Sequence, residues 1–225
     1  MHIEPGLVDP TKIALSYVTA AMAGGYALKL ASDGIREKGL ASVAMRTLAT
    51  TLLVFSFFEI FPHYPVGVSE VHFIMGSTLF LVFGAGPAAL GLAGGLMLQG
   101  TFFAPTDLPQ YGMNLTTLLV PLFGISALAG RVVPKDTPYV ELTYSQALAL
   151  STAYQGGIIA WVAFWSIYGR GMGAENLSSI ASFGGAYMLV IVIEPLADLA
   201  VLAIAKSWHS VSGTGLVTPR LYNAA

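Results

Sequence analysis

The first two residues, Met1 and His2, form a potential chelating group for a metal ion. A free N-terminus followed by histidine offers the α-amine, the deprotonated His2 amide nitrogen and the ring Nδ1 atom. These nitrogens lie in one plane, close a five-membered and a six-membered chelate ring, and leave one corner of the plane empty. Planar nitrogen coordination suits Ni(II) and Cu(II). The alternative interpretation is a frayed terminus with an accidental histidine.

The empty corner needs one more nitrogen, and three further histidines could supply it. His72 is the candidate, because it begins a predicted membrane span and should point into the mouth of a helix bundle. His63 lies between two prolines in a predicted loop, where we expect it to face solvent or lipid headgroups. His209 falls in a predicted tail on the opposite side of the membrane. The predicted metal ligands are therefore Met1, His2 and His72.

The elements that position these residues are predicted from a strongly apolar composition. The 225 residues include 10 Lys and Arg, 12 Asp and Glu, and 55% hydrophobic residues, with a mean hydropathy of +0.72. Only 10% of the residues are charged, less than half of the share typical of soluble domains, which argues against a soluble enzyme and a disordered chain. No basic stripe is present for nucleic acid, and no cysteine for disulfides or thiolate metal sites. The chain is predicted to be an integral membrane protein.

Seven apolar runs are predicted to form helices, since a bilayer-crossing helix needs about 20 mostly apolar residues. They cover residues 11–31, 43–61, 72–84, 87–103, 114–133, 145–169 and 178–205. The run 72–103 is too long for one crossing and is divided before Pro87, because proline favours the start of a helix. The predicted fold is an all-α polytopic transmembrane bundle. It forms a single domain, residues 1–225, with a metal-binding segment at 1–10 and a polar tail at 207–225.

The orientation of the bundle follows from its Lys and Arg residues, which gather on the cytoplasmic side of membrane proteins. With the N-terminus outside and the C-terminus inside, the outer end carries only Lys12 and Arg170. The inner end then collects the others: Lys29, Arg36, Lys38, Arg46, Arg131, Lys135, Lys206 and Arg220. No cleavable signal peptide is expected, because the segment before the first span is acidic.

Three carboxylates fall within the predicted spans, where ionisable groups are costly and usually functional. Glu59 lies near the outer end of the second span, and Glu194 and Asp198 lie one turn apart in the seventh. A membrane-embedded enzyme using Glu59, Glu194 and His72 for acid–base chemistry is one alternative function, although Glu194 lies several turns below the mouth. A structural membrane protein with an accidental Met-His start is another. No Walker-type loop or nucleophile elbow is present.

Two short motifs resemble those of a known family. Met1-His2-Ile3 and the segment 69–72, Ser-Glu-Val-His, are similar to motifs of the CbiM/NikM family, the membrane substrate-binding components of energy-coupling-factor (ECF) transporters for cobalt and nickel. The second family motif has the form Ser-Gly-His-x-x-Gly. The resemblance implies metal ligation by the Met1 amine, the His2 amide and ring nitrogens, and the ring of His72. Gln99, Asn114 and Glu194 correspond to polar family positions with less certain roles.

The resemblance also implies how such a protein works. The transported substrate would be Ni(II) or Co(II), with no organic cofactor and no nucleic-acid partner. The partners would be a transmembrane coupling protein, two ATPase subunits and often a small extra membrane subunit, in the cell inner (cytoplasmic) membrane. The sequence departs from the family pattern at Glu4-Pro5, whose order is exchanged, at Val71 in place of glycine, and at Pro195. These departures leave the preference between nickel and cobalt open.

Overall fold

The computed structural model describes residues 2–134 and 137–211. Each predicted helical run corresponds to one helix of the described chain. The helices are α1 (Ala14–Lys38), α2 (Leu40–Glu59), α3 (Gly76–Phe83), α4 (Ala85–Phe102), α5 (Tyr111–Val132), α6 (Tyr144–Arg170) and α7 (Ala174–Val211). Short elements complete them: strands β1 (Tyr64–Val66) and β2 (Ser69–Val71), and 3-10 helices η1 (Pro105–Gln110) and η2 (Tyr139–Glu141). The prediction of an all-α bundle is confirmed.

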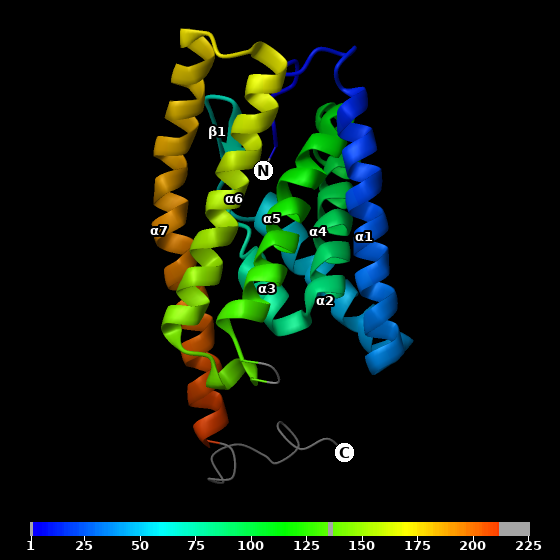
Figure 1. The fold of residues 1–225 in the computed structure, drawn as a ribbon, viewed down its shortest axis with the longest axis vertical. Coiled ribbons are helices and arrows are strands. Elements are labelled where there is room, and N and C mark those ends of the chain that lie inside the picture. The colour runs from blue at the N-terminus through cyan, green and yellow to red at the C-terminus, as the bar shows by residue number, and fades with distance from the viewer. Residues whose placement is uncertain (1, 135–136, 212–225) are drawn as a thin grey trace.

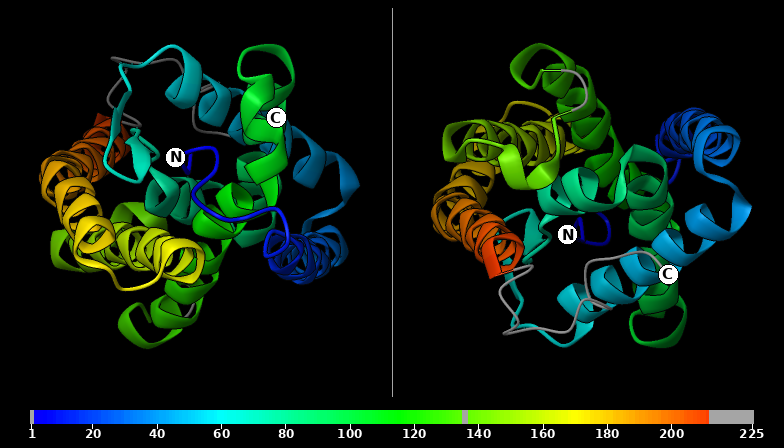
Figure 2. Two further views of the ribbon diagram at one scale, coloured as in Figure 1. Left: turned by 90° about the horizontal axis from the view of Figure 1, so that it is seen from above. Right: turned by 90° about the horizontal axis from the view of Figure 1, so that it is seen from below.

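The long helices lie side by side along the longest axis of the molecule (Figure 1). Tight connections at Gly39 and Gly84, both with positive φ, reverse the chain between α1 and α2 and between α3 and α4. Consecutive helices therefore alternate in direction when the short α3 is included, and α1, α5 and α7 all begin at the upper end in Figure 1. The end views in Figure 2 show the N-terminal segment running from α1 into the middle of the ring of helices.

Four helical segments are long and apolar enough to cross a membrane. They are Leu40–Glu59, Pro105–Val132, Tyr144–Arg170 and Ala174–Trp208. Helix α3 has eight residues and rises about 12 Å, less than half of a hydrocarbon core of about 30 Å. The third predicted span is therefore a short helix rather than a complete crossing. Helix α7 continues through residues 207–211, the first part of the predicted tail, and residues 212–225 lie outside the described residues.

Small residues allow α2 and α4 to approach closely. A Cβ atom added at Gly91 would lie 2.1 Å from the Thr50 hydroxyl oxygen, and one at Gly95 would lie 2.6 Å from a Val54 methyl carbon. Close packing through small residues is typical of membrane helices. By contrast, a Cβ atom at Gly24 of α1 would meet no atom of the described chain within 4 Å. Close approach of another helix therefore occurs at these positions of α4 but not at Gly24 of α1.

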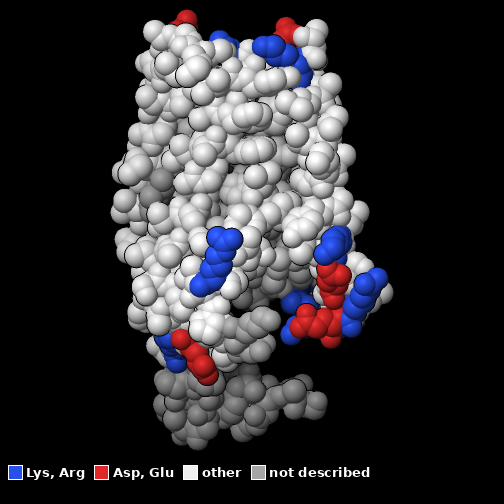
Figure 3. Space-filling model, in the orientation of Figure 1, with Lys and Arg blue, Asp and Glu red and all other residues white. Residues whose placement is uncertain are grey.

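Charged side chains gather at the two ends of the molecule and leave a wide uncharged band between them (Figure 3). At the lower end, Arg36 and Lys38 lie in the last turn of α1 and Arg131 in the last turn of α5. At the upper end, Arg170 lies in the last turn of α6. Large apolar side chains of α7 such as Leu189 are exposed in the band. This distribution fits a multi-pass membrane protein, with the apolar band facing lipid.

Cysteine labelling tests the predicted orientation, since the chain has no cysteine of its own. We expect a cysteine at Ser32, near the lower end of α1, to be protected from an impermeant reagent in intact cells. Cysteines at Thr106 in η1 and Glu175 in α7, at the upper end, should react, and all three native side chains are exposed. Asp136, also predicted to be protected, lies outside the described residues. Reaction at Ser32 with protection at Thr106 and Glu175 would invert the orientation.

Candidate metal centre

The N-terminal segment lies alongside β2 and pairs with it. The Glu70 backbone N–H donates to the His2 carbonyl oxygen at 2.8 Å, and the Ser69 hydroxyl donates to the same oxygen at 2.8 Å. Ile3 and Ser69 form an antiparallel bridge. Strand β2 itself pairs with β1 in a short hairpin. These bonds fix the backbone of His2 next to the residues that precede His72.

A side chain of α5 holds the N-terminal segment from the other side. The Asn114 side-chain oxygen accepts a hydrogen bond of 2.8 Å from the Ile3 backbone N–H. Both residues are buried, so the bond is shielded from water, and a buried unpaired N–H would be costly. Asn114 thus positions the segment that carries His2, a contact that the sequence alone did not assign.

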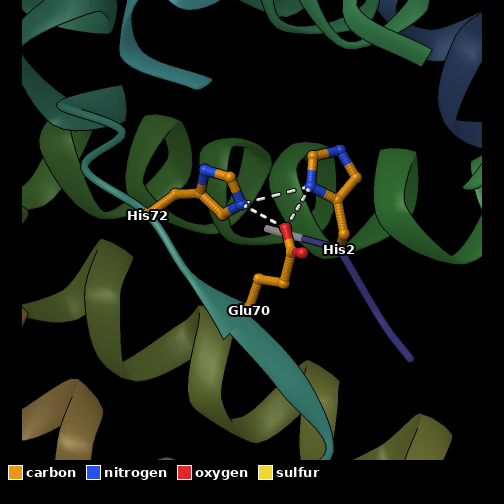
Figure 4. A group of neighbouring side chains, drawn as sticks. All are labelled: His2, Glu70 and His72. Atoms are coloured by element: carbon orange, nitrogen blue, oxygen red, sulfur yellow. Dashed lines mark hydrogen bonds and ion pairs between the residues drawn. The ribbon is translucent and has the colours of Figure 1, made fainter. Parts of the chain in front are cut away.

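Three side-chain atoms meet at this point (Figure 4). His2 Nδ1 lies 3.1 Å from His72 Nε2 and 3.0 Å from Glu70 Oε2, and His72 Nε2 lies 2.8 Å from the same carboxylate oxygen. Glu70 and His72 share a side of the chain because alternate residues of an extended segment point the same way. Within residues 2–134 and 137–211 these three side chains form the group that could hold a metal ion. Met1, the remaining predicted ligand, lies outside the described residues.

Aromatic rings enclose the two histidines. The Phe58 ring meets the rings of His2 and His72 edge-on, with centroids 5.9 Å and 5.2 Å apart. His63 stacks on His72, with centroids 4.8 Å apart and planes 10° from parallel. His63 is half-buried, so it contacts a predicted ligand while part of its surface stays open, and its predicted role as a solvent- or headgroup-facing loop residue stays a prediction. The hairpin β1–β2 folds the loop back over the site, which the flanking prolines did not indicate.

The surroundings of the three groups set their charges. Burial lowers the pKa of His2, and it lowers the pKa of His72 well below its usual value, because imidazolium is poorly solvated there. Burial acts to raise the pKa of Glu70, but hydrogen bonds from the two rings outweigh it and hold that pKa below its usual value. At neutral pH the cluster therefore consists of two neutral imidazoles and one carboxylate. Such a set carries one negative charge, and its ring nitrogens can bind a cation once the protons that they share with the carboxylate are displaced.

Known proteins resemble this chain in sequence and in fold. The family model CbiM, described as the cobalt uptake substrate-specific transmembrane region, matches residues 2–210. The chain belongs to the CbiM family. The resemblance seen in the two short motifs is thereby confirmed over nearly the whole chain. CbiM proteins are membrane components of metal transport, and no curated protein matches this chain.

Two crystal structures resemble this CbiM chain in fold. One, described as a transition metal transporter, has a TM-score of 0.66 and 19% identity and covers 92% of this chain and 93% of its own. The other, described as a truncated transition metal transporter, has a TM-score of 0.64 and 16% identity, with coverages of 93% and 98%. At these identities the likeness concerns the fold alone.

A second carboxylate lies near the cluster of this CbiM chain. Asp107 Oδ2, in η1, is 4.0 Å from His2 Nε2. If His2 binds a metal through Nδ1, its ring proton resides on Nε2, a buried atom that has no other partner among the described residues. Metal-binding histidines commonly give this proton to a carboxylate. Neither Asp107 nor Glu70 was named as a site residue from sequence, although Glu70 stands two positions before His72 in an extended segment.

The other predicted polar residues lie outside the cluster. Glu194 accepts a hydrogen bond from the Ile74 backbone N–H, and Asp198 accepts bonds from the hydroxyls of Ser77 and Thr78. Both carboxylates of α7 therefore bind the first turn of α3 and the residues before it, where helix N–H groups lack partners. Glu59 and Gln99 are likewise not part of the metal cluster. The structure thus does not bring Glu59, Glu194 and His72 together as one acid–base site.

Proposed function

We propose that this protein is the substrate-binding component of an ECF-type transporter and captures Ni(II) or Co(II) at its outer end. The observation that carries this proposal is the buried pair His2 Nδ1 and His72 Nε2, 3.1 Å apart. Two nitrogen ligands about 2.05 Å from a metal, at adjacent corners of a plane, are about 2.9 Å apart. The two rings therefore stand close to the separation that shared coordination requires, before any ion is present.

The remaining ligands in this proposal are the Met1 α-amine and the His2 amide nitrogen. Together with His2 Nδ1 they would occupy three corners of a plane, and His72 Nε2 would occupy the fourth. Energy for uptake would come from partner subunits, a transmembrane coupling protein and two ATPases, with a small extra membrane subunit in some assemblies. We place the complex in the cell inner membrane, with Lys12 and Arg170 on the outer side.

Equilibrium titration of the detergent-solubilised protein, with its native terminus intact, tests this function. We expect one Ni(II) or Co(II) ion per chain and competition between the two ions for one site. Mg(II) should not compete, because it prefers oxygen ligands and keeps its water. The protein with His2→Ala, prepared identically, should lose the site. Absence of stoichiometric binding by the native protein would contradict the proposal and favour a structural membrane protein with an accidental Met-His start.

A further inference from the structure

The carboxylate of Glu70 forms one corner of an almost regular triangle of donor atoms. Its Oε2 atom lies 3.0 Å from His2 Nδ1 and 2.8 Å from His72 Nε2, and the two nitrogens are 3.1 Å apart. Figure 4 shows the three side chains converging, that of His2 from the N-terminal segment and those of Glu70 and His72 from β2 and the residue that follows it. The carboxylate is as close to each nitrogen as the nitrogens are to each other.

Hydrogen bonds hold the three donor atoms at distances that also match one coordination geometry. Ligand atoms about 2.1 Å from a metal stand about 3.4 Å apart in a tetrahedron, and about 3.0 Å apart when they meet at 90°. The observed separations fit the 90° arrangement. An atom at 90° to two adjacent corners of a plane cannot itself lie in that plane. The Glu70 oxygen would therefore occupy the axial position above a plane that contains His2 Nδ1 and His72 Nε2.

The charge of Glu70 also fits a ligand. Its side chain is one-quarter exposed, with a relative accessibility of 26%. Its hydrogen-bond partners among the described residues are the rings of His2 and His72. A cation bound between these rings would lie next to the carboxylate and be attracted by its negative charge.

We propose that Glu70 is a direct axial ligand of the transported ion, so that the site holds a five- or six-coordinate, high-spin metal. This inference rests on the proposed function and refines its substrate. Low-spin Ni(II) in a plane of four nitrogens takes no axial ligand, whereas Co(II) accepts five or six donors of mixed nitrogen and oxygen type. The axial carboxylate thus favours Co(II), and it obliges any bound Ni(II) to become high-spin.

Magnetic susceptibility and visible absorption of the Ni(II)- and Co(II)-loaded protein test this assignment. We expect paramagnetic Ni(II), with two unpaired electrons, in the native protein. Glu70→Ser should convert it to diamagnetic planar Ni(II), and Glu70→Ser and Glu70→Gln should each weaken Co(II) binding by at least about tenfold. The matched control is Asp107→Asn, which removes the same charge beside His2 but no ligand. It should change affinity without changing the spin state.

The outcomes separate the two proposals. A native protein that binds Ni(II) stoichiometrically but diamagnetically would overturn the role of Glu70 and leave the transport function standing. So would a Glu70→Ser variant whose spectra match those of the native protein. Failure of the native protein to bind either ion would remove both proposals. Circular dichroism and elution volume establish that each variant is folded before its spectra are compared.

Discussion

Replacing His72 by alanine should reduce the affinity for Ni(II) and Co(II) by more than about 100-fold. Even residues that only orient a metal ligand contribute up to that factor, and His72 Nε2 is 3.1 Å from the other ring nitrogen of the cluster. Among the described residues, His2 and His72 are the histidines of that cluster. Calorimetric titration of the native and variant proteins measures the loss, and thermal unfolding checks that the bundle persists.

His63→Ala is the matched control for this experiment. The His63 ring stacks on His72, but its Nδ1 atom faces the Phe61 carbonyl oxygen at 3.2 Å. Removing the ring should therefore change affinity only a few-fold, through loss of packing against His72. If His63→Ala removed binding while His72→Ala retained it, the assignment of the fourth nitrogen would be wrong.

Extending the chain before Met1 should abolish high-affinity metal binding without unfolding the protein. Two added residues with a neutral block turn the Met1 amine into an amide, which no longer offers a lone pair to the metal. The bundle should remain folded, because most of its buried core lies in the helices and the added residues precede those of the N-terminal segment that pack in it. Metal content and calorimetric affinity of the extended and native proteins measure the effect.

A C-terminal extension of equal length is the control for this second experiment. It adds the same number of residues at the end of the chain that is predicted to lie on the other side of the membrane. We expect native affinity from that protein. Equal metal binding by the N-extended and native proteins would exclude the amine as a ligand and leave His2, Glu70 and His72 as the described donors.

The helices were predictable from sequence because lipid imposes a simple rule on composition. Runs of apolar residues long enough to fill the hydrocarbon core stand out from any other pattern, and Gly84 and Pro87 marked the division between α3 and α4. The length of α3 was less predictable. Its eight residues are followed by Gly84 with positive φ. At its start, Asp198 of α7 accepts bonds from the hydroxyls of Ser77 and Thr78, and Glu194 accepts one from the backbone of Ile74, two residues before the helix.

The site was predictable only in part, for a different physical reason. His72 could be chosen because it stands at the start of an apolar run and shares a predicted side of the membrane with His2. Glu70 and Asp107 could not be chosen in this way. Their closeness to His2 depends on the pairing that fixes the N-terminal segment against β2. Such pairing joins residues that are far apart in the chain, and it produces no periodic pattern in the sequence. His63 illustrates the same limit, because its contact with His72 exists only once the hairpin β1–β2 has formed.

The hydrogen bond from Ile3 to Asn114 has a consequence for how the protein is made. These residues lie 111 positions apart, and a chain is synthesised from its N-terminus. The pairing of His2 and Ile3 with β2 can form as soon as β2 has been synthesised, but the bond to Asn114 must wait until α5 has left the ribosome. Until then the N-terminal segment is held from one side only. The capacity to hold a metal is in this sense acquired late in biosynthesis, although the residue that begins the site is among the first to be made.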